Sequence, residues 1–419
     1  MKIIKALFSP GISAFFFDDQ RAIKKGALND GFIYEGNTVT AGFRRIREAG
    51  ESISIQLLLE DGQIARGDCA AVQYSGAGGR DPLFLAREYI PFLEKHIRPL
   101  LEGREVSSFR QMTGELMGIK IKKRRLHTAI RYGLSQALLD ARAKERHLLP
   151  TEVICNEYDL PIIPRRNQIF GQSGDNRYEN VDKMILKNVD VLPHGLINNI
   201  ETKLGYQGEK LREYIRWLVA RTRKIRLKED YRPALHLDVY GTLGIAFDYD
   251  IPRIVDYIAS LEQDADGFPL YIEGPVDMED KPGTIEKMAE ITKGLENSGS
   301  PVKIVADEWC NTLEDIKDFV DARAGHMVQI KTPDLGGIQK VVESVLYCKQ
   351  HGVEAYQGGT CNETDLSARI SVQVAMAVRS ERVLAKPGMG FDEGFTIVNN
   401  EMERIISVLK YKYGEKNHG

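Results

Sequence analysis

The chain has 419 residues, of which 42% are hydrophobic, and this length can bury one large core together with that of a second domain. Its 57 lysines and arginines nearly balance 60 aspartates and glutamates, giving a formal net charge of -3 at pH 7. Because there is no basic excess, the composition argues against nucleic acid or an anionic membrane surface as a partner. A small molecule is the expected ligand.

The cysteines are odd in number, scattered and without C-x-x-C spacing, so they indicate neither a disulfide framework nor a zinc site. They are Cys69, Cys155, Cys310, Cys348 and Cys361. The apolar run near the N-terminus is interrupted by Pro10 and Gly11 and lacks a small-residue cleavage site, which argues against a signal peptide. No apolar stretch approaches the roughly 20 residues that span a bilayer, so we expect a cytoplasmic protein.

Residues 1–160 are predicted to form a mixed α+β domain. Residues 52–60 alternate like a strand, and a turn sequence leads from them to a second strand at 63–68. The clearest helix is predicted at 126–146, where apolar residues recur at the spacing of one helix face. The glycine-rich loop at 73–82 lacks both nucleotide-binding glycine patterns, so it is not predicted to hold a phosphate.

Residues 161–412 consist of short apolar runs, each followed by a helical segment, and residues 413–419 are left as a tail. Repeated strand-helix units predict a (β/α)8 barrel, a TIM-type fold whose reactive groups lie at the C-terminal ends of the strands. The predicted strands are residues 169–172, 184–187, 235–239, 270–273, 303–307, 328–331, 354–357 and 382–385.

Three acidic residues, Asp238, Glu273 and Asp307, close successive predicted strands and are separated by 35 and 34 residues, about one strand-helix unit each. In a barrel they would meet at one point, where three negative charges repel unless a cation lies between them. Oxygen ligands without cysteine or histidine favour Mg²⁺. The alternative is that each acid caps a helix or begins a loop, but the regular spacing favours the metal site.

Lys331 shares one face of its predicted strand with Gln329, while Ile330 points the other way. A lysine reaching the surface as its strand ends is the alternative interpretation. One strand beyond a metal, however, a lysine suits proton abstraction next to a carboxylate, with the divalent ion stabilising the resulting enediolate. Partial desolvation and a nearby cation would lower the pKa of Lys331 so that part of it acts as a base.

Two histidines are further candidates. His194 follows Pro193 and could approach from the opposite side of the barrel mouth, although a lone histidine is more often structural. His236 is in phase with Asp238 and is therefore expected to face the barrel interior, in support of the metal ligands.

These residues and several longer motifs resemble the enolase superfamily and, within it, the methylaspartate ammonia-lyase family, nearly from end to end. The matching stretches are residues 17–26, 67–85, 126–133, 190–194, 307–312, 326–337 and 358–364.

The resemblance implies an N-terminal capping α+β domain on a modified TIM barrel, a homodimer, and reversible elimination of ammonia from (2S,3S)-3-methylaspartate to give mesaconate in glutamate fermentation. It places Mg²⁺ at Asp238, Glu273 and Asp307, with K⁺ as a monovalent activator. Lys331 takes the position of the base that removes the C3 proton, and His194 that of the acid/base on the opposite face. Substrate-binding positions correspond to Gln73, Gln172, His194, Gln329, Thr360 and Cys361.

The departures from the family pattern are small. Gln357 stands where cysteine is expected, which could alter the surroundings of Thr360 and Cys361, and residues 155–168 follow the family loosely. A carboxylate racemase or cycloisomerase of the same superfamily would use the same three acids. A barrel kept only for binding would have lost the metal or base residues, and this chain retains all of them.

Overall fold

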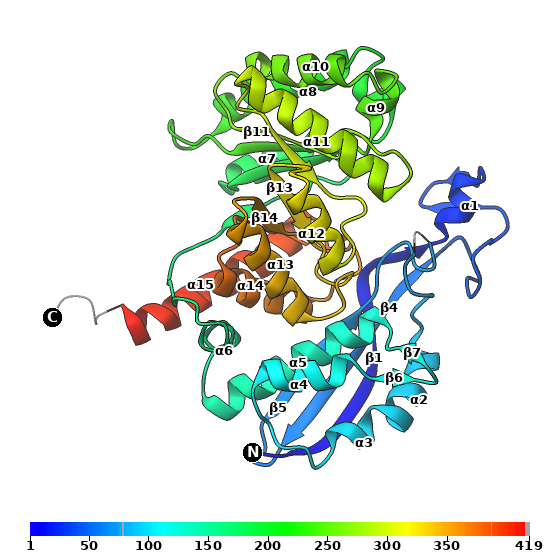
Figure 1. Cartoon of the computed structure of the whole chain (residues 1–419), viewed down its shortest axis with the longest axis vertical. Helices are drawn as coiled ribbons and strands as arrows, with labels where there is room; N and C mark the ends of the chain where they lie inside the picture. The colour runs from blue at the N-terminus through cyan, green and yellow to red at the C-terminus, as the bar shows by residue number, and fades with distance from the viewer. Residues whose placement is uncertain (78, 387, 415–419) are drawn as a thin grey trace.

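The computed structural model describes residues 1–77, 79–386 and 388–414. Its first part is built on a three-stranded antiparallel sheet in the order β1-β4-β5, formed by β1 (Ile3–Asp18), β4 (Arg47–Leu59) and β5 (Ile64–Ala70). Helix α5 (Thr128–Arg146) packs on this sheet through its apolar face, in a cluster that includes Ile55 and Leu134. This sheet and its helices lie at one end of the molecule in Figure 1.

The predicted strands at 52–60 and 63–68 and the helix at 126–146 are therefore present, whereas β1 was not predicted. Strand β1 was missed because it contains Pro10 and Gly11, and both residue types are unfavourable within a strand. The other elements of this part are small hairpins and helices. They are α1 (Gln20–Lys24), β2 (Leu28–Asp30), β3 (Ile33–Glu35), α2 (Ala86–His96), α3 (Arg98–Leu101), α4 (Phe109–Met117), β6 (Lys120–Ile121), β7 (Arg124–Arg125) and α6 (Pro150–Glu157).

The second part is a closed barrel of eight parallel strands, each followed by at least one helix, and the TIM-type prediction is confirmed. The strands are β8 (Gln168–Phe170), β9 (Val191–Leu196), β10 (Ala234–Asp238), β11 (Leu270–Glu273), β12 (Lys303–Ala306), β13 (Met327–Ile330), β14 (Glu354–Gln357) and β15 (Arg382–Leu384).

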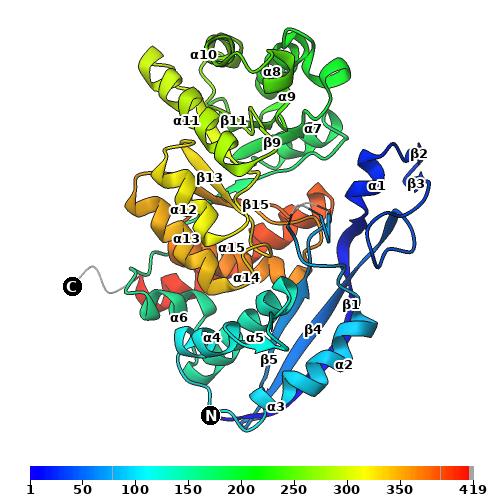
Figure 2. The same ribbon diagram turned by 45° about the vertical axis from the view of Figure 1, so that its right-hand side comes forward.

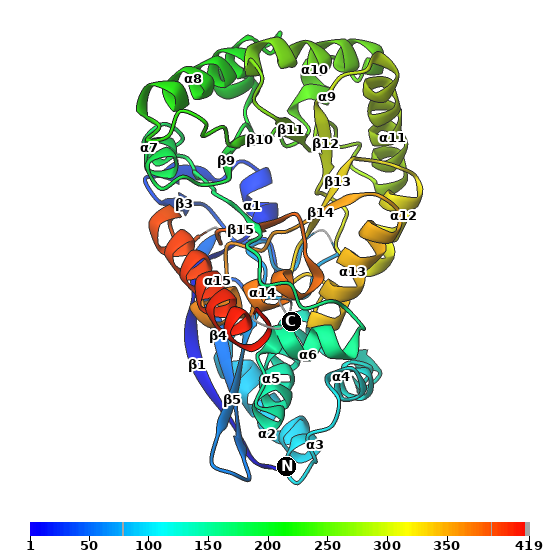
Figure 3. The ribbon, with the colours of Figure 1, turned by 90° about the vertical axis from the view of Figure 1, so that its left-hand side faces the viewer.

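The helices follow one another around these strands in chain order (Figure 3). They are α7 (Glu179–Leu186), the π-helical turn η1 (Ile200–Leu204), α8 (Glu209–Ile225), α9 (Thr242–Ala246), α10 (Ile251–Ala265), α11 (Lys281–Ser298), α12 (Leu313–Asp321), α13 (Ile338–Gln350), α14 (Asp365–Val378) and α15 (Phe391–Tyr413). Helix α15 includes the first residue of the predicted tail, and residues 415–419 lie outside the described residues.

One predicted strand is wrong: residues 184–187 end helix α7 instead. The buried residues of α7 are Val181, Met184 and Ile185, a helical spacing that a four-residue window cannot distinguish from a strand. The true second strand is β9, and Pro193 obscured it because proline cannot donate a backbone hydrogen bond to a sheet. His194 is therefore part of a barrel strand and does not lie beyond one.

Several hydrogen bonds join the first part of the chain to the barrel, among them one to α5 and one to β5. In Figures 1 and 2, α1 and the ends of β1 and β4 reach toward the barrel. The Ser135 hydroxyl of α5 accepts a hydrogen bond from the backbone N–H of Ile338 at 2.9 Å, and the Thr364 hydroxyl donates to Asp68 at 2.7 Å. Helix α5 and strand β5 are therefore fixed against the barrel by hydrogen bonds. In the described part of the chain, no helix has the length and apolar character that crossing a membrane requires.

Candidate active site

The order of strands places the two candidate acid/base residues on opposite sides of the barrel mouth. His194 lies on β9, and Lys331 immediately follows β13. Three strands separate β9 from β13 in each direction around the closed barrel. The three acids occupy one of these arcs, on β10, on β11 and just after β12, whereas Gln172, Thr360 and the last residues of β15 lie on the other.

Asp238 and Glu273 are almost completely buried at adjacent strand ends, paired in register in the sheet. Burial raises the pKa of Asp238 well above its usual value, and repulsion by Asp307 adds to the effect. Burial, followed by the charges of Asp238 and Asp307, likewise raises the pKa of Glu273. Two buried carboxylates that destabilise each other in this way form a donor set that a hard divalent cation fits.

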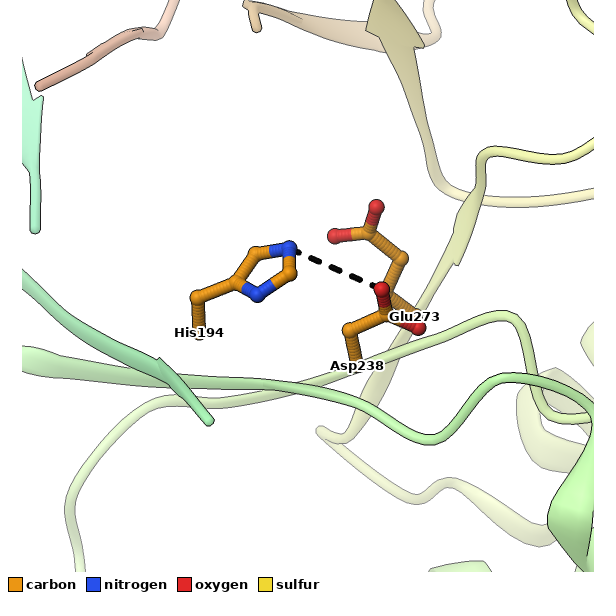
Figure 4. A group of neighbouring side chains, drawn as sticks. All are labelled: His194, Asp238 and Glu273. Atoms are coloured by element: carbon orange, nitrogen blue, oxygen red, sulfur yellow. Dashed lines mark ion pairs between the residues drawn. The ribbon is translucent and has the colours of Figure 1, made fainter. Parts of the chain in front are cut away.

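Ligand atoms of His194, Asp238 and Glu273 lie within 4.8 Å of one another, and Figure 4 shows the three side chains directed at a common space. The His194 Nε2 atom is 3.6 Å from Oδ2 of Asp238. Asp307, the third predicted ligand, is not in this group of three.

Asp307 is paired with Lys331 instead, with 2.9 Å between Nζ and Oδ1, and it lies close enough to raise the pKa values of the other two acids. Burial raises the pKa of Asp307 to about 6, against the opposing effect of Lys331. Burial lowers the pKa of Lys331, but attraction to Asp307 and Glu308 outweighs it, so that the net pKa is raised. The lowered pKa that we predicted from the sequence therefore does not arise from the protein's own charges.

His194 is buried and neutral at physiological pH. Burial lowers its pKa to about 4, with a further contribution from the positive charge of Lys331. Its backbone has φ of 64°, in the left-handed region that few non-glycine residues adopt, and its Nδ1 atom has no hydrogen-bond partner. Strained backbone of this kind is concentrated at functional sites.

A buried network inside the barrel supports Glu273. The Arg382 guanidinium donates to Nδ1 of His236 at 2.8 Å, so the neutral imidazole carries its proton on Nε2, which lies 2.5 Å from Glu273. The Tyr356 hydroxyl is 2.8 Å from the same carboxylate, and the Gln329 amide donates to that hydroxyl at 2.5 Å. The prediction that His236 faces the barrel interior is confirmed.

A cavity of about 150 Å³ brings the predicted substrate-binding residues together. Gln73 enters from the first part of the chain, where its amide donates to Asp18 at 2.7 Å and its backbone N–H to the Thr360 hydroxyl at 3.3 Å. The residues predicted from the sequence that line this cavity are Gln73, Gln172, His194, Asp238, Asp307, Gln329, Lys331, Thr360 and Cys361. A cavity of this size suits a small ligand.

Several lining residues were not predicted. Arg80 contributes a cation, with its Nε atom 3.7 Å from Asp334, and Leu384 contributes an apolar wall. Tyr356 does not line the cavity, but its hydroxyl donates to Glu273 and accepts from Gln329, which does. Strand alternation could have identified Leu384 and Tyr356, because inward-facing residues recur at every second position. Arg80 lies in the glycine-rich loop at 73–82, which belongs to a stretch that matches the family, but the loop has no periodic pattern from which the direction of the side chain could be inferred.

Gln357, the departure from the family pattern, does not line the cavity. Its amide donates to the Ser371 backbone carbonyl at 2.9 Å and to the Ser371 hydroxyl at 3.0 Å, so the side chain points outward toward α14. The concern about Thr360 and Cys361 is therefore not supported by the contacts of this side chain.

A closed parallel barrel with an N-terminal α+β part and carboxylates at successive strand ends is the enolase-like fold. The structure of L-Ala-D/L-Glu epimerase from Bacillus subtilis has this fold, with a TM-score of 0.63 at 16% identity over 94% of this chain and 91% of that one. The chain belongs to the methylaspartate ammonia-lyase family: residues 1–159 match the family's N-terminal model and residues 161–411 its C-terminal model. Members of this family are carbon–nitrogen lyases.

Two solved structures are similar over nearly the whole chain. Methylaspartate ammonia-lyase from Citrobacter amalonaticus, containing (2S,3S)-3-methylaspartic acid, is 62% identical over 98% of this chain and 100% of that one, with a TM-score of 0.96. The Mg complex of β-methylaspartase from Clostridium tetanomorphum is 56% identical, with the same coverage and TM-score. Each structure matches this chain over both the barrel and the first part of the chain.

Proposed function

We propose that this protein catalyses the reversible elimination of ammonia from (2S,3S)-3-methylaspartate to give mesaconate. The observation that carries the proposal is the placement of Lys331 and His194 on diametrically opposite strands, with three carboxylates on the arc between them. A substrate held in the cavity of about 150 Å³ would have one reactive group on each of its faces. The similarity to two methylaspartate ammonia-lyases over the full length supports the choice of substrate.

In the forward reaction, the Nζ atom of neutral Lys331 takes the proton from C3, the C2–N bond breaks, and the C2=C3 double bond forms as ammonia leaves. His194 lies on the other side of the mouth and serves the 3-epimer, whose C3 proton points the opposite way. The amides of Gln73, Gln172 and Gln329 donate to the substrate carboxylates. The polar groups of Thr360 and Cys361 complete this set of contacts.

Asp238, Glu273 and Asp307 would hold Mg²⁺, which fits their buried and mutually repulsive carboxylates. A bound Mg²⁺ would supply positive charge that stabilises the charge developing on the substrate carboxylate and that competes with Lys331 for Asp307. A monovalent cation, K⁺, is the proposed activator, and no residues are assigned to it.

The test is the ultraviolet absorbance of the conjugated diacid. Purified protein with (2S,3S)-3-methylaspartate and Mg²⁺ should give a rising signal that EDTA abolishes, and replacing K⁺ by Na⁺ should lower the rate. A folded protein that gives no signal with Mg²⁺ would refute the proposed reaction. Racemisation of carboxylates, followed by circular dichroism, is then the next assay.

We further propose a capping domain at residues 1–160, a barrel domain at 161–412 and a tail at 413–419. The two family models meet between residues 159 and 161, and α6 ends at Glu157 before β8 begins at Gln168, which supports this division. A homodimer in the cytoplasm, active in glutamate fermentation, completes the proposal. Sedimentation of the purified protein tests the dimer.

A further inference from the structure

An ion pair without solvent contact lies beneath the loop that carries Thr360 and Cys361. The Glu363 and Lys386 side chains are both 0% exposed, with 3.2 Å between Nζ and Oε1. Removing two charges from water has a large desolvation cost. Well-packed apolar residues in the same position therefore often give a folded protein that is as stable as, or more stable than, one with a buried ion pair. A buried pair beside the candidate active site therefore points to a role other than general stability.

The Glu363 carboxylate accepts from four donors, as many as an ionised carboxylate can accommodate. Lys386 and the Thr332 hydroxyl, at 2.6 Å, donate to Oε1. The hydroxyls of Tyr132, at 3.1 Å, and Ser367, at 2.6 Å, donate to Oε2. Because every acceptor site of Glu363 is filled, its geometry is fixed, and it fixes that of its donors.

The donors come from segments that position proposed active-site residues. Thr332 directly follows Lys331, so its bond to Glu363 determines where the main chain leaves β13. The Lys386 ammonium also donates to the backbone carbonyl of Gly358 at 2.6 Å, two residues before Thr360. The base and the substrate-binding loop are thus tied to the same two side chains.

The loop rests directly on the ion pair. A Cβ atom added at Gly359 would lie 2.9 Å from Oε1 of Glu363, closer than real Cβ atoms approach, and 3.0 Å from Nζ of Lys386. A larger residue at this position would therefore displace the charged end of at least one of these two side chains.

The same loop is held from the other side by the first part of the chain. The Ala14 backbone N–H donates to the Glu363 carbonyl at 3.0 Å, and the Asn362 amide donates to the Phe16 carbonyl at 2.9 Å. Tyr132 belongs to α5 of that same part. The ion pair is therefore the point where β13, the loop after β14, the segment after β15 and the first part of the chain meet.

We propose that Glu363 and Lys386 are positioning residues that hold the base Lys331 and the loop of Thr360 and Cys361 in their reactive arrangement. The inference rests on the proposed function, because Glu363 and Lys386 can act as positioning residues only if Lys331 and the loop of Thr360 and Cys361 contact the same substrate. Neither side chain lines the cavity, so the effect is transmitted through Thr332 and Gly358.

The test compares Glu363→Gln with a matched control, Glu152→Gln. Glu152 is also 0% exposed, pairs with Lys412 at 2.9 Å and accepts from the Tyr413 hydroxyl at 2.6 Å, but it lies between α6 and α15, away from the cavity. Both variants lose a buried charge and should lower Tm. Glu363→Gln should also reduce kcat at least about tenfold, since small misplacement of reacting groups is costly.

Three measurements separate the outcomes. Mg²⁺ affinity by calorimetry should stay within about twofold of wild type for both variants, because the described hydrogen bonds of neither residue include one to a proposed metal ligand. If wild type is active and Glu363→Gln matches Glu152→Gln in kcat, the positioning role is wrong. If wild type is inactive on (2S,3S)-3-methylaspartate, the proposed function fails instead.

A milder variant decides the matter if Glu363→Gln does not fold. Thr332→Val removes one hydrogen bond to Oε1 and keeps the shape of the side chain. It should lower kcat at least about threefold with KM within about twofold, because it displaces the base more than the binding loop. An unchanged kcat in folded Thr332→Val would overturn the inference.

Discussion

Replacing Lys331 by methionine removes the proposed base while keeping the apolar part of its side chain. Only 12% of the Lys331 side chain is exposed, and its ammonium is 2.9 Å from Asp307. General base catalysis typically contributes 10² to 10⁴-fold in rate. We therefore expect kcat/KM for the (2S,3S) isomer to fall by at least about 100-fold, or about 2.7 kcal/mol of transition-state stabilisation.

The same variant should not weaken Mg²⁺ binding. At an effective dielectric constant of about 20, two charges 2.9 Å apart attract by about 6 kcal/mol before desolvation is counted. Mg²⁺ has to compete with this attraction for Asp307, and methionine removes the competitor. The dissociation constant measured by calorimetry should therefore be equal to that of wild type or lower.

A matched control is Lys281→Met on α11, whose ammonium pairs with Asp315 and Asp318 at 2.8 Å outside the cavity. This control should retain wild-type kcat/KM, measured by mesaconate absorbance at saturating Mg²⁺. The base assignment is refuted if folded Lys331→Met keeps kcat/KM within about tenfold of wild type. Weaker Mg²⁺ binding in that variant would refute the competition for Asp307.

Three further changes test other parts of the site and fold. Asp307→Asn should raise the Mg²⁺ dissociation constant by about tenfold or more by removing a charged ligand, and an unchanged calorimetric titration would exclude Asp307 as a ligand. His194→Ala should impair the 3-epimer more than the (2S,3S) isomer, and an equal loss of kcat/KM on both would mean that it only binds. Burial lowers the pKa of His127, whose Nδ1 caps α5 by accepting from Ala129, so protonation below about pH 6.5 favours the unfolded chain. The variant His127→Asn keeps a side-chain acceptor at the cap but has no group that titrates in this range. The free energy of unfolding of the wild type, measured in urea, should therefore exceed that of the variant by less at pH 5 than at pH 7. A difference that stays constant between these pH values would contradict the prediction.

The sequence by itself determined the fold class and the identity of the candidate site residues. Repeated strand-helix units predicted the (β/α)8 barrel, which is present, and Asp238, Glu273 and Asp307 lie at the ends of successive strands as their spacing indicated. Strand periodicity also assigned Gln329 and Lys331 to one face and His236 to the interior. These properties depend on the periodicity of apolar and polar residues within short segments, which can be read from the sequence itself.

The second barrel strand could not be read in the same way. Met184 and Ile185 are apolar neighbours in a short segment, and only packing against the rest of the protein decides that they belong to a helix. β9 contains Pro193 and the left-handed residue His194, so its local preferences oppose a strand, and the pairing with β8 and β10 overrides them.

The tertiary structure alone decided distances and charge relations. Closure of the barrel places His194 opposite Lys331, although 137 residues separate them in the sequence. It also pairs Lys331 with Asp307, which raises the pKa of the lysine where a lowered one was predicted. The Glu363–Lys386 pair depends on contacts among three barrel segments and the first part of the chain. Such relations arise from long-range packing, because burial and electrostatic attraction depend on neighbours that no local sequence pattern identifies.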